Sequence, residues 1–191
     1  MHIIDSHFHW RPRALLDWAC KSKGFPRAER DGKGGYIWMI REGYQVKIRN
    51  NHPAWAPLDV MLAEMDKLGH QVDVVCTIGP LSVYFSELEP EAGRDAAMLW
   101  NEEMAVAQKA FPGRFFGTAA VPLKDTKTAI DVLDHAINRL GLYGANLPGS
   151  VGTDPRIDHE RLWPFYKRAE ERSEEHTSEL QSHSFISYAV F

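Results

Sequence analysis

Two histidines near the start of the chain, His7 and His9, are separated by a single residue. The short apolar run before them, Ile3 and Ile4, predicts a strand. Alternate side chains of a strand point to the same face, so the two imidazoles should project together while Phe8 turns away. Imidazoles paired in this way bind divalent metals, zinc above all. The spacing therefore predicts that both histidines bind one metal ion. The alternative is a surface turn that happens to contain both residues.

The residue after this pair, Trp10, could line the same pocket or pack as an ordinary core side chain. The histidines that fall on predicted loops or helices have no partner at ligand spacing. We read them as structural or exposed: His52, His70, His135 and His159.

The elements that follow alternate between strands and helices. Nearly continuous apolar runs at 72–78, 115–121 and 143–147 predict buried strands. Apolar residues at helical spacing predict helices at 57–69, 93–111, 125–141 and 161–171. Two segments at 36–40 and 44–48, on either side of a turn, predict a β-hairpin inside an otherwise irregular stretch at 11–51. Strict alternation of strands with helices is typical of a parallel sheet.

The number of strand–helix units favours half of a closed barrel. Doubling the observed units would reach the eight of a (β/α)₈ barrel, in about twice this length. A doubly wound open sheet is the competing fold, but it would usually place a glycine-rich phosphate loop where His7 and His9 stand. We therefore predict an α/β fold: the N-terminal half of a TIM barrel, strands one to four, with a β-hairpin inserted after strand one. The carboxyl ends of barrel strands are where active sites are built.

The last part of the sequence, residues 172–191, resembles a translated sequencing adapter with a short variable index at 183–185. A natural serine-rich tail is the alternative. We exclude this segment from fold reasoning, as for any processing or cloning remnant. The predicted organisation is a truncated barrel domain over residues 1–171 and an artefactual tail over 172–191.

Bulk composition excludes several classes of partner. The formal net charge is −4, and it would be −2 without residues 172–191, which contain one arginine and three glutamates. No basic patch appears, so we expect neither nucleic acid nor a membrane surface as a partner. The two cysteines, Cys20 and Cys76, lie far apart and suit a reducing compartment. With no secretory signal in view, we expect a cytoplasmic protein.

The segment from Ile4 to Glu171 resembles the amidohydrolase superfamily, and within it the decarboxylase branch typified by aminocarboxymuconate-semialdehyde decarboxylase. The likeness lies in the order and spacing of several features rather than in one motif. These are the His7-x-His9 pair, the hairpin insertion, the helix-to-strand step at 65–75, the Phe-Pro-Gly-Arg-Phe-Phe-Gly run at 111–117 with Ala-Val-Pro at 120–122, and the Leu-Gly-Leu-Tyr-Gly-Ala-Asn run at 140–146.

The resemblance implies a mononuclear metal site, usually zinc, and no organic cofactor. His7 and His9 match its first two ligands; the others, a histidine on strand five and an aspartate on strand eight, would lie beyond Glu171 together with the catalytic acid or base, which remains unassigned. The resemblance also implies that Arg41 and Lys47 hold a substrate carboxylate, although the two basic types are exchanged relative to the family. A guanidinium and an ammonium are not equivalent there, which leaves the substrate open. Ordinary solvated hairpin charge is the alternative for both.

The function implied is a zinc-dependent carboxy-lyase that decarboxylates a small unsaturated or aromatic carboxylic acid. A hydrolase of the same superfamily, acting on a lactone or amide, is the nearest alternative, since both would use a metal-activated water. A third possibility is that the chain itself is a catalytically inactive fragment of such an enzyme. Homodimers are common in the family and would be possible here.

Overall fold

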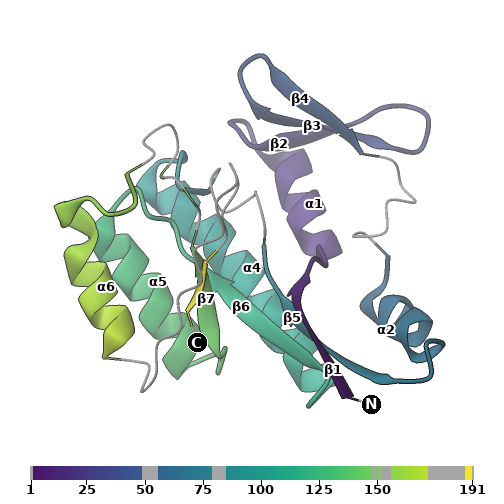
Figure 1. The fold of residues 1–191 in the computed structure, drawn as a ribbon. Helices are drawn as coiled ribbons and strands as arrows, with labels where there is room; N and C mark the ends of the chain where they lie inside the picture. Colours follow the sequence, from purple (N-terminus) through teal and green to yellow (C-terminus); the bar gives the residue numbers. More distant parts are fainter. Residues whose placement is uncertain are drawn as a thin grey trace.

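The computed structural model describes residues 2–48, 56–78, 85–147, 149, 151, 156–171 and 188–190. Four parallel strands form the main sheet in the order β1, β5, β6, β7: His2–Phe8, Gln71–Cys76, Phe115–Ala120 and Gly144–Leu147. Each strand pairs with the next strand of the sheet along the chain, as in a barrel. The sheet curls and is half of a cylinder (Figure 1). The predicted half-barrel is confirmed.

Helices connect the parallel strands and cover the outside of the sheet: α2 Leu58–Asp66, α4 Pro90–Ala110, α5 Thr126–Asn138 and α6 Trp163–Glu170, the last preceded by the short 3₁₀ helix Glu160–Leu162. In Figure 1, α4, α5 and α6 lie side by side behind β5, β6 and β7. The helix predicted at 93–111 is present as α4, and its Trp100 and Met104 side chains are fully buried. Asp125, the first residue of the helix predicted at 125–141, caps α5 and accepts a hydrogen bond of 2.8 Å from the Thr128 amide. Within the described part of the chain, no helix is long and apolar enough to cross a membrane.

One predicted core position is wrong. The helical spacing of the segment predicted at 57–69 places Leu68 on its buried face, but its side chain is 66% exposed. The helix ends at Asp66, and Gly69 then takes a φ of 72°. A positive φ suits glycine and turns the chain toward β5. Leu68 therefore lies in the turn, where the helical spacing no longer applies.

The insertion after β1 is larger than the predicted hairpin. The hairpin itself is present as β3 (Tyr36–Arg41) and β4 (Tyr44–Ile48). A third strand, β2 (Arg27–Arg30), pairs with β3, and a helix, α1 (Arg13–Lys21), precedes it. The expectation of irregular structure outside the hairpin is thus wrong. The small sheet lies beside α1 at the end of the molecule toward which β1 runs (Figure 1).

This insertion shares the core of the half-barrel. Leu15 and Leu16 of α1 and Trp38 of β3 are almost fully buried, in the same apolar cluster as Phe8 and Phe85. Trp18 of α1 also meets Phe85 edge to face, with 6.1 Å between the ring centroids. The insertion is therefore packed onto the barrel strands rather than tethered to them.

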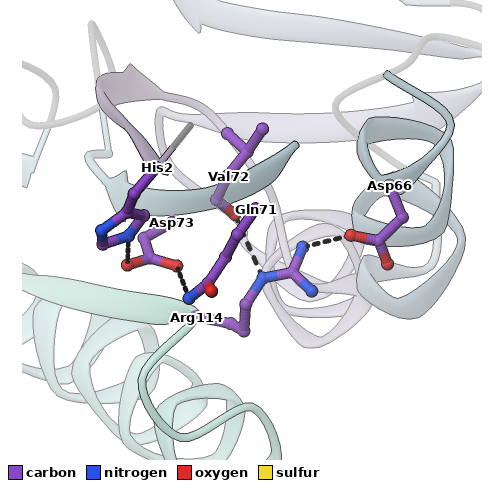
Figure 2. Close-up of polar contacts among 6 residues, drawn as sticks. All are labelled: His2, Asp66, Gln71, Val72, Asp73 and Arg114. Atoms are coloured by element: carbon purple, nitrogen blue, oxygen red, sulfur yellow. Dashed lines mark hydrogen bonds and ion pairs between the residues drawn. The ribbon is translucent and has the colours of Figure 1, made fainter. Parts of the chain in front are cut away.

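The amino ends of the strands are joined by two groups of polar contacts (Figure 2). His2 and Gln71 both hydrogen bond to the Asp73 carboxylate, the latter over 3.1 Å. Burial alone would raise the pKa of Asp73, but these hydrogen bonds outweigh it and lower the pKa below its usual value. Arg114 donates to the carbonyl oxygen of Val72 (3.1 Å) and to Asp66 (3.0 Å), connecting β6 to β5 and α2.

The outer edge of β7 is paired with a segment that we had excluded. Strand β8 (Tyr188–Val190) runs antiparallel to β7, with Asn146 opposite Ala189. An edge strand exposes unpaired main-chain groups, which attract any nearby β-forming segment. A half-barrel without residues 172–191 would leave this edge open; the structure covers it with Tyr188–Val190. That the segment is an adapter product remains a prediction.

Gly117 of β6 allows α4 to approach the sheet closely. A Cβ atom at this position would lie 2.7 Å from Met104 Cβ, on a fully buried side chain that cannot move away. We expect Gly117→Ala to lower the free energy of unfolding by about 1–3 kcal/mol, because the added methyl overpacks the core. Chemical denaturation followed by circular dichroism measures this.

Gly24→Ala is the matched control. No atom lies within 4 Å of a Cβ built at Gly24, so that substitution should change the stability by less than about 0.5 kcal/mol. Equal stability of the two variants would contradict the packing that we describe.

Candidate metal centre

His7 and His9 are brought together at the carboxyl end of β1. Their Nε2 atoms lie 3.2 Å apart, and the two rings meet edge to face with centroids 4.8 Å apart. Phe8 points the other way into the core, where it is 5% exposed. The strand alternation predicted from the sequence therefore places both imidazoles on one side.

The hydrogen bonding of His9 determines which of its nitrogens can bind a metal. Its Nδ1 lies 3.0 Å from the carbonyl oxygen of Thr77, at the end of the neighbouring strand β5. A carbonyl oxygen can only accept a hydrogen bond, so Nδ1 must bear the hydrogen. In the neutral ring this leaves a lone pair on Nε2, the atom that faces His7. Histidine ligands of metal ions are usually held in this way.

The separation of the two Nε2 atoms fits a shared ion. Two nitrogens at Zn–N distances of about 2.0–2.1 Å, at a tetrahedral angle, would lie roughly 3.3–3.4 Å apart. The observed 3.2 Å is close to that separation. Without an ion, the contact requires His7 to donate from its own Nε2–H to the lone pair of His9. The pair is therefore arranged as two of the ligands that a tetrahedral or larger coordination shell needs.

Burial also favours the neutral, metal-binding form of His9. Desolvation lowers the pKa of His9 below its usual value, helped by the nearby His7 and Arg11, while the bond to Thr77 and the charge of Asp5 act in the opposite direction. Asp5 additionally accepts a hydrogen bond of 3.0 Å from the backbone amide of His7, at an irregularity in the pairing of β1 with β5. This bond holds the bend from which the His7 side chain projects.

Within the described residues, no third histidine, cysteine or carboxylate completes a cluster of ligands around this pair. That the missing ligands lie on barrel strands beyond Glu171 stays a prediction. The donor set that is present, two imidazole nitrogens, suits zinc and other divalent transition metals such as iron, nickel and copper.

Trp10 is partly buried and oriented by two contacts. Its indole Nε1 donates to the carbonyl oxygen of Ala56 over 3.2 Å, and its ring meets Phe115 edge to face at 5.9 Å. The structure thus gives Trp10 a packing role next to the histidine pair. A contact with substrate stays a prediction.

The two predicted carboxylate-binding residues lie on the small sheet, at the ends of β3 and β4. Lys47 is 60% exposed, and its Nζ lies 3.5 Å from a carboxylate oxygen of Asp31. The other oxygen of Asp31 accepts from the amides of Lys33 and Gly35, so this carboxylate is fixed by its own turn. Arg41 ends β3, but its side chain lies outside the described part of the structure.

Two further residues near the carboxyl ends of the strands are buried. Phe85 packs against Trp18, a structural role. Asn146 is fully buried on β7.

Sequence reasoning missed Thr77, the residue that fixes His9. It is the first polar side chain after the apolar strand β5, and its amide donates to the carbonyl oxygen of Phe8 over 3.0 Å. A polar residue at the carboxyl end of a strand is a usable signal in a barrel. Its contact with His9 depends on the register of two strands far apart in the chain, which no local pattern reveals.

Comparison with known proteins agrees with the predicted resemblance. No protein-family model matches the chain. A curated 2-amino-3-carboxymuconate-6-semialdehyde decarboxylase of Dictyostelium discoideum is 26% identical over 179 residues, an alignment that covers 87% of this chain and 45% of the relative. The chain thus spans just under half the length of this relative.

Solved structures share the fold. The 2,6-dihydroxybenzoate decarboxylase from Rhizobium superposes with a TM-score of 0.60 at 21% identity, covering 89% of this chain and 46% of that one. A dihydroxybenzoic acid decarboxylase from a Polaromonas species, crystallised with manganese and the inhibitor 2-nitroresorcinol, gives a TM-score of 0.59 at 19% identity, covering 87% and 45%. The chain is therefore similar in sequence to aminocarboxymuconate-semialdehyde decarboxylases, and it has the fold of about half of an amidohydrolase-superfamily decarboxylase.

Proposed function

We propose that this chain is the N-terminal half of a metal-dependent carboxy-lyase that removes CO₂ from a small unsaturated or aromatic carboxylic acid. The observation that supports the proposal most directly is the His7–His9 pair, with Nε2 atoms 3.2 Å apart and the His9 lone pair fixed by Thr77. The names of the similar proteins support decarboxylation as the reaction.

We propose zinc as the resident ion, bound by His7, His9 and ligands contributed by the part of the barrel beyond Glu171. A bound divalent ion would supply Lewis acidity toward the substrate carboxylate or carbonyl. The manganese in the Polaromonas decarboxylase supports a divalent ion in general. By itself, the present chain would be inactive, because a catalytic zinc takes three protein ligands and His7 and His9 are two.

The residues of this chain that would meet the substrate are Arg41, Lys47 and Trp10. Arg41 and Lys47 would hold the carboxylate through charge-assisted hydrogen bonds, which are about twice as strong as neutral ones. For Lys47 this requires its ammonium to exchange Asp31 for the substrate, a change that its exposed position allows. Trp10 would form an apolar wall beside the metal. A cytoplasmic location, a homodimer and the absence of an organic cofactor remain part of this proposal.

The first prediction concerns the metal ligands. In the complete protein, recovered from the coding sequence beyond Glu171, His7→Ala or His9→Ala should each lower the rate of CO₂ release by about 10³-fold or more. Loss of the ion removes several kcal/mol of charge stabilisation, and each 1.4 kcal/mol corresponds to tenfold. Metal content by atomic spectrometry should fall in parallel.

His70→Ala serves as the control for that experiment, since His70 is exposed and precedes β5 at the opposite end of the sheet. Its metal content and rate should match the unsubstituted protein. Full activity of either ligand variant would refute the metal site. Ring opening without CO₂ release would indicate the hydrolase instead.

The second prediction concerns substrate binding. Lys47→Met should lower kcat/KM about 10–100-fold, mainly through KM, because a charged hydrogen bond to a carboxylate contributes about 1.5–3 kcal/mol. Steady-state kinetics on the complete protein measures this. Lys67→Met removes a comparable exposed lysine, paired with Glu64 on the surface, and should change neither constant. If the two variants behave alike, Lys47 does not bind the substrate.

A further inference from the structure

Thr77 contacts His9 with two oxygen atoms rather than one. Besides the carbonyl oxygen at 3.0 Å, the side-chain hydroxyl Oγ1 lies 3.2 Å from the same Nδ1 atom. One N–H can be shared between two acceptors. Because one oxygen belongs to the backbone and the other to the side chain of Thr77, sharing restricts the plane of the His9 ring as well as its tautomer.

The position of these two oxygens is itself well determined. The Thr77 residue is 3% exposed, so its hydroxyl does not exchange His9 for bulk water. The threonine side chain is branched at Cβ and has few rotamers. The Thr77 amide donates to the carbonyl oxygen of Phe8, the residue directly before His9, which continues the β1–β5 pairing beyond Cys76. Thr77 is thus joined to the strand whose histidine it orients.

We propose that Thr77 is a positioning residue for the metal site: its hydroxyl and carbonyl together hold His9 as the Nδ1–H tautomer, with the Nε2 lone pair directed at the position beside His7. The role in metal binding rests on the proposed function. The orientation of the His9 ring by Thr77 depends only on the contacts between these two residues. It extends the site from the two ligands to the neighbouring strand.

The experiment uses the 191-residue chain labelled with ¹⁵N in its histidine rings. Long-range ¹H–¹⁵N correlation spectra report which ring nitrogen bears the hydrogen, and His9→Gln identifies the His9 signals. We expect unsubstituted His9 to be protonated on Nδ1. In Thr77→Val, which keeps the shape but removes the hydroxyl, the carbonyl oxygen remains as an acceptor, so the Nδ1–H form should stay the main one while the population of the Nε2–H form rises.

A zinc titration on the same samples gives the second readout. Loss of a hydrogen-bond partner of a metal-bound histidine typically weakens metal binding 10–100-fold. Because the Thr77 carbonyl remains, we expect the lower end of that range, about tenfold, for Thr77→Val. Thr77→Ser retains the hydroxyl and should restore both the tautomer and the affinity.

Thr118→Val is the matched control. Thr118 is an equally buried threonine on the adjacent strand β6, whose hydroxyl donates to the Cys76 carbonyl oxygen over 2.7 Å. Loss of the Thr118 hydroxyl should lower the free energy of unfolding about as much as loss of the Thr77 hydroxyl does. It should leave the His9 tautomer and the zinc affinity unchanged.

The possible outcomes separate this inference from the proposed function. Nε2 protonation of His9 in the unsubstituted chain overturns the inference, as does an unchanged tautomer and affinity in Thr77→Val, or an equal effect of Thr118→Val. If Thr77→Val changes the tautomer while His7→Ala and His9→Ala leave the metal content of the complete protein unchanged, the positioning role stands and the metal assignment fails. If Thr77→Val does not fold, the unsubstituted tautomer and Thr77→Ser still decide.

Discussion

The parallel pairing of β1 with β5 is the interaction on which the rest of this structure depends. It sets Phe8 opposite Cys76 and brings Thr77 to the carbonyl oxygen of Phe8. A shift by one residue would reverse every side chain of β1, sending His7 and His9 into the core and Phe8 to the outside. The metal pair, its orientation and the burial of Phe8 are therefore consequences of one register.

That register is held at both ends of the strands. At the amino end, His2 reaches Asp73 from β1, and Arg114 connects β6 with β5 and α2 (Figure 2). At the carboxyl end, the pairing is irregular between Asp5 and Phe8, and α1 of the insertion packs in the same apolar cluster as Phe8. Polar contacts thus fix the alignment at one end, whereas apolar packing covers the other.

The carboxyl half of β6 shows how side chains can replace a strand ladder. The pairing of β5 with β6 includes Cys76 and Gly117 as its last residues. Beyond it, the Asn101 side-chain amide accepts from the amide of Ala120 over 2.8 Å and donates to its carbonyl oxygen over 3.2 Å. Buried main-chain groups need partners, and here α4 supplies them. The strands can therefore diverge without leaving polar groups unsatisfied.

Whether a structural feature could be predicted from the sequence depends on how far apart in the chain its interacting residues lie. Three of the four parallel strands were predictable because both faces of such a sheet are buried, which makes the runs almost continuously apolar, whereas β1 was predicted from Ile3 and Ile4 alone. Helix α1 was missed because its signal is short, consisting of Pro12 before Leu15, Leu16 and Ala19 within a glycine-rich and aromatic stretch. The His7–His9 pair was visible because its geometry is local. Thr77 was not, since its role arises from a contact across 68 positions of the chain.

Within the described residues, β1 pairs with one strand only, β5. Half of its main-chain amides therefore face away from the sheet, and peptide groups at such an edge open more readily than those in a central strand. His7 lies on this edge strand and His9 directly follows it. In deuterated solvent, the outward-facing amides of β1 should be among the first in the sheet to exchange. Coordination of an ion by His7 and His9 should slow this exchange.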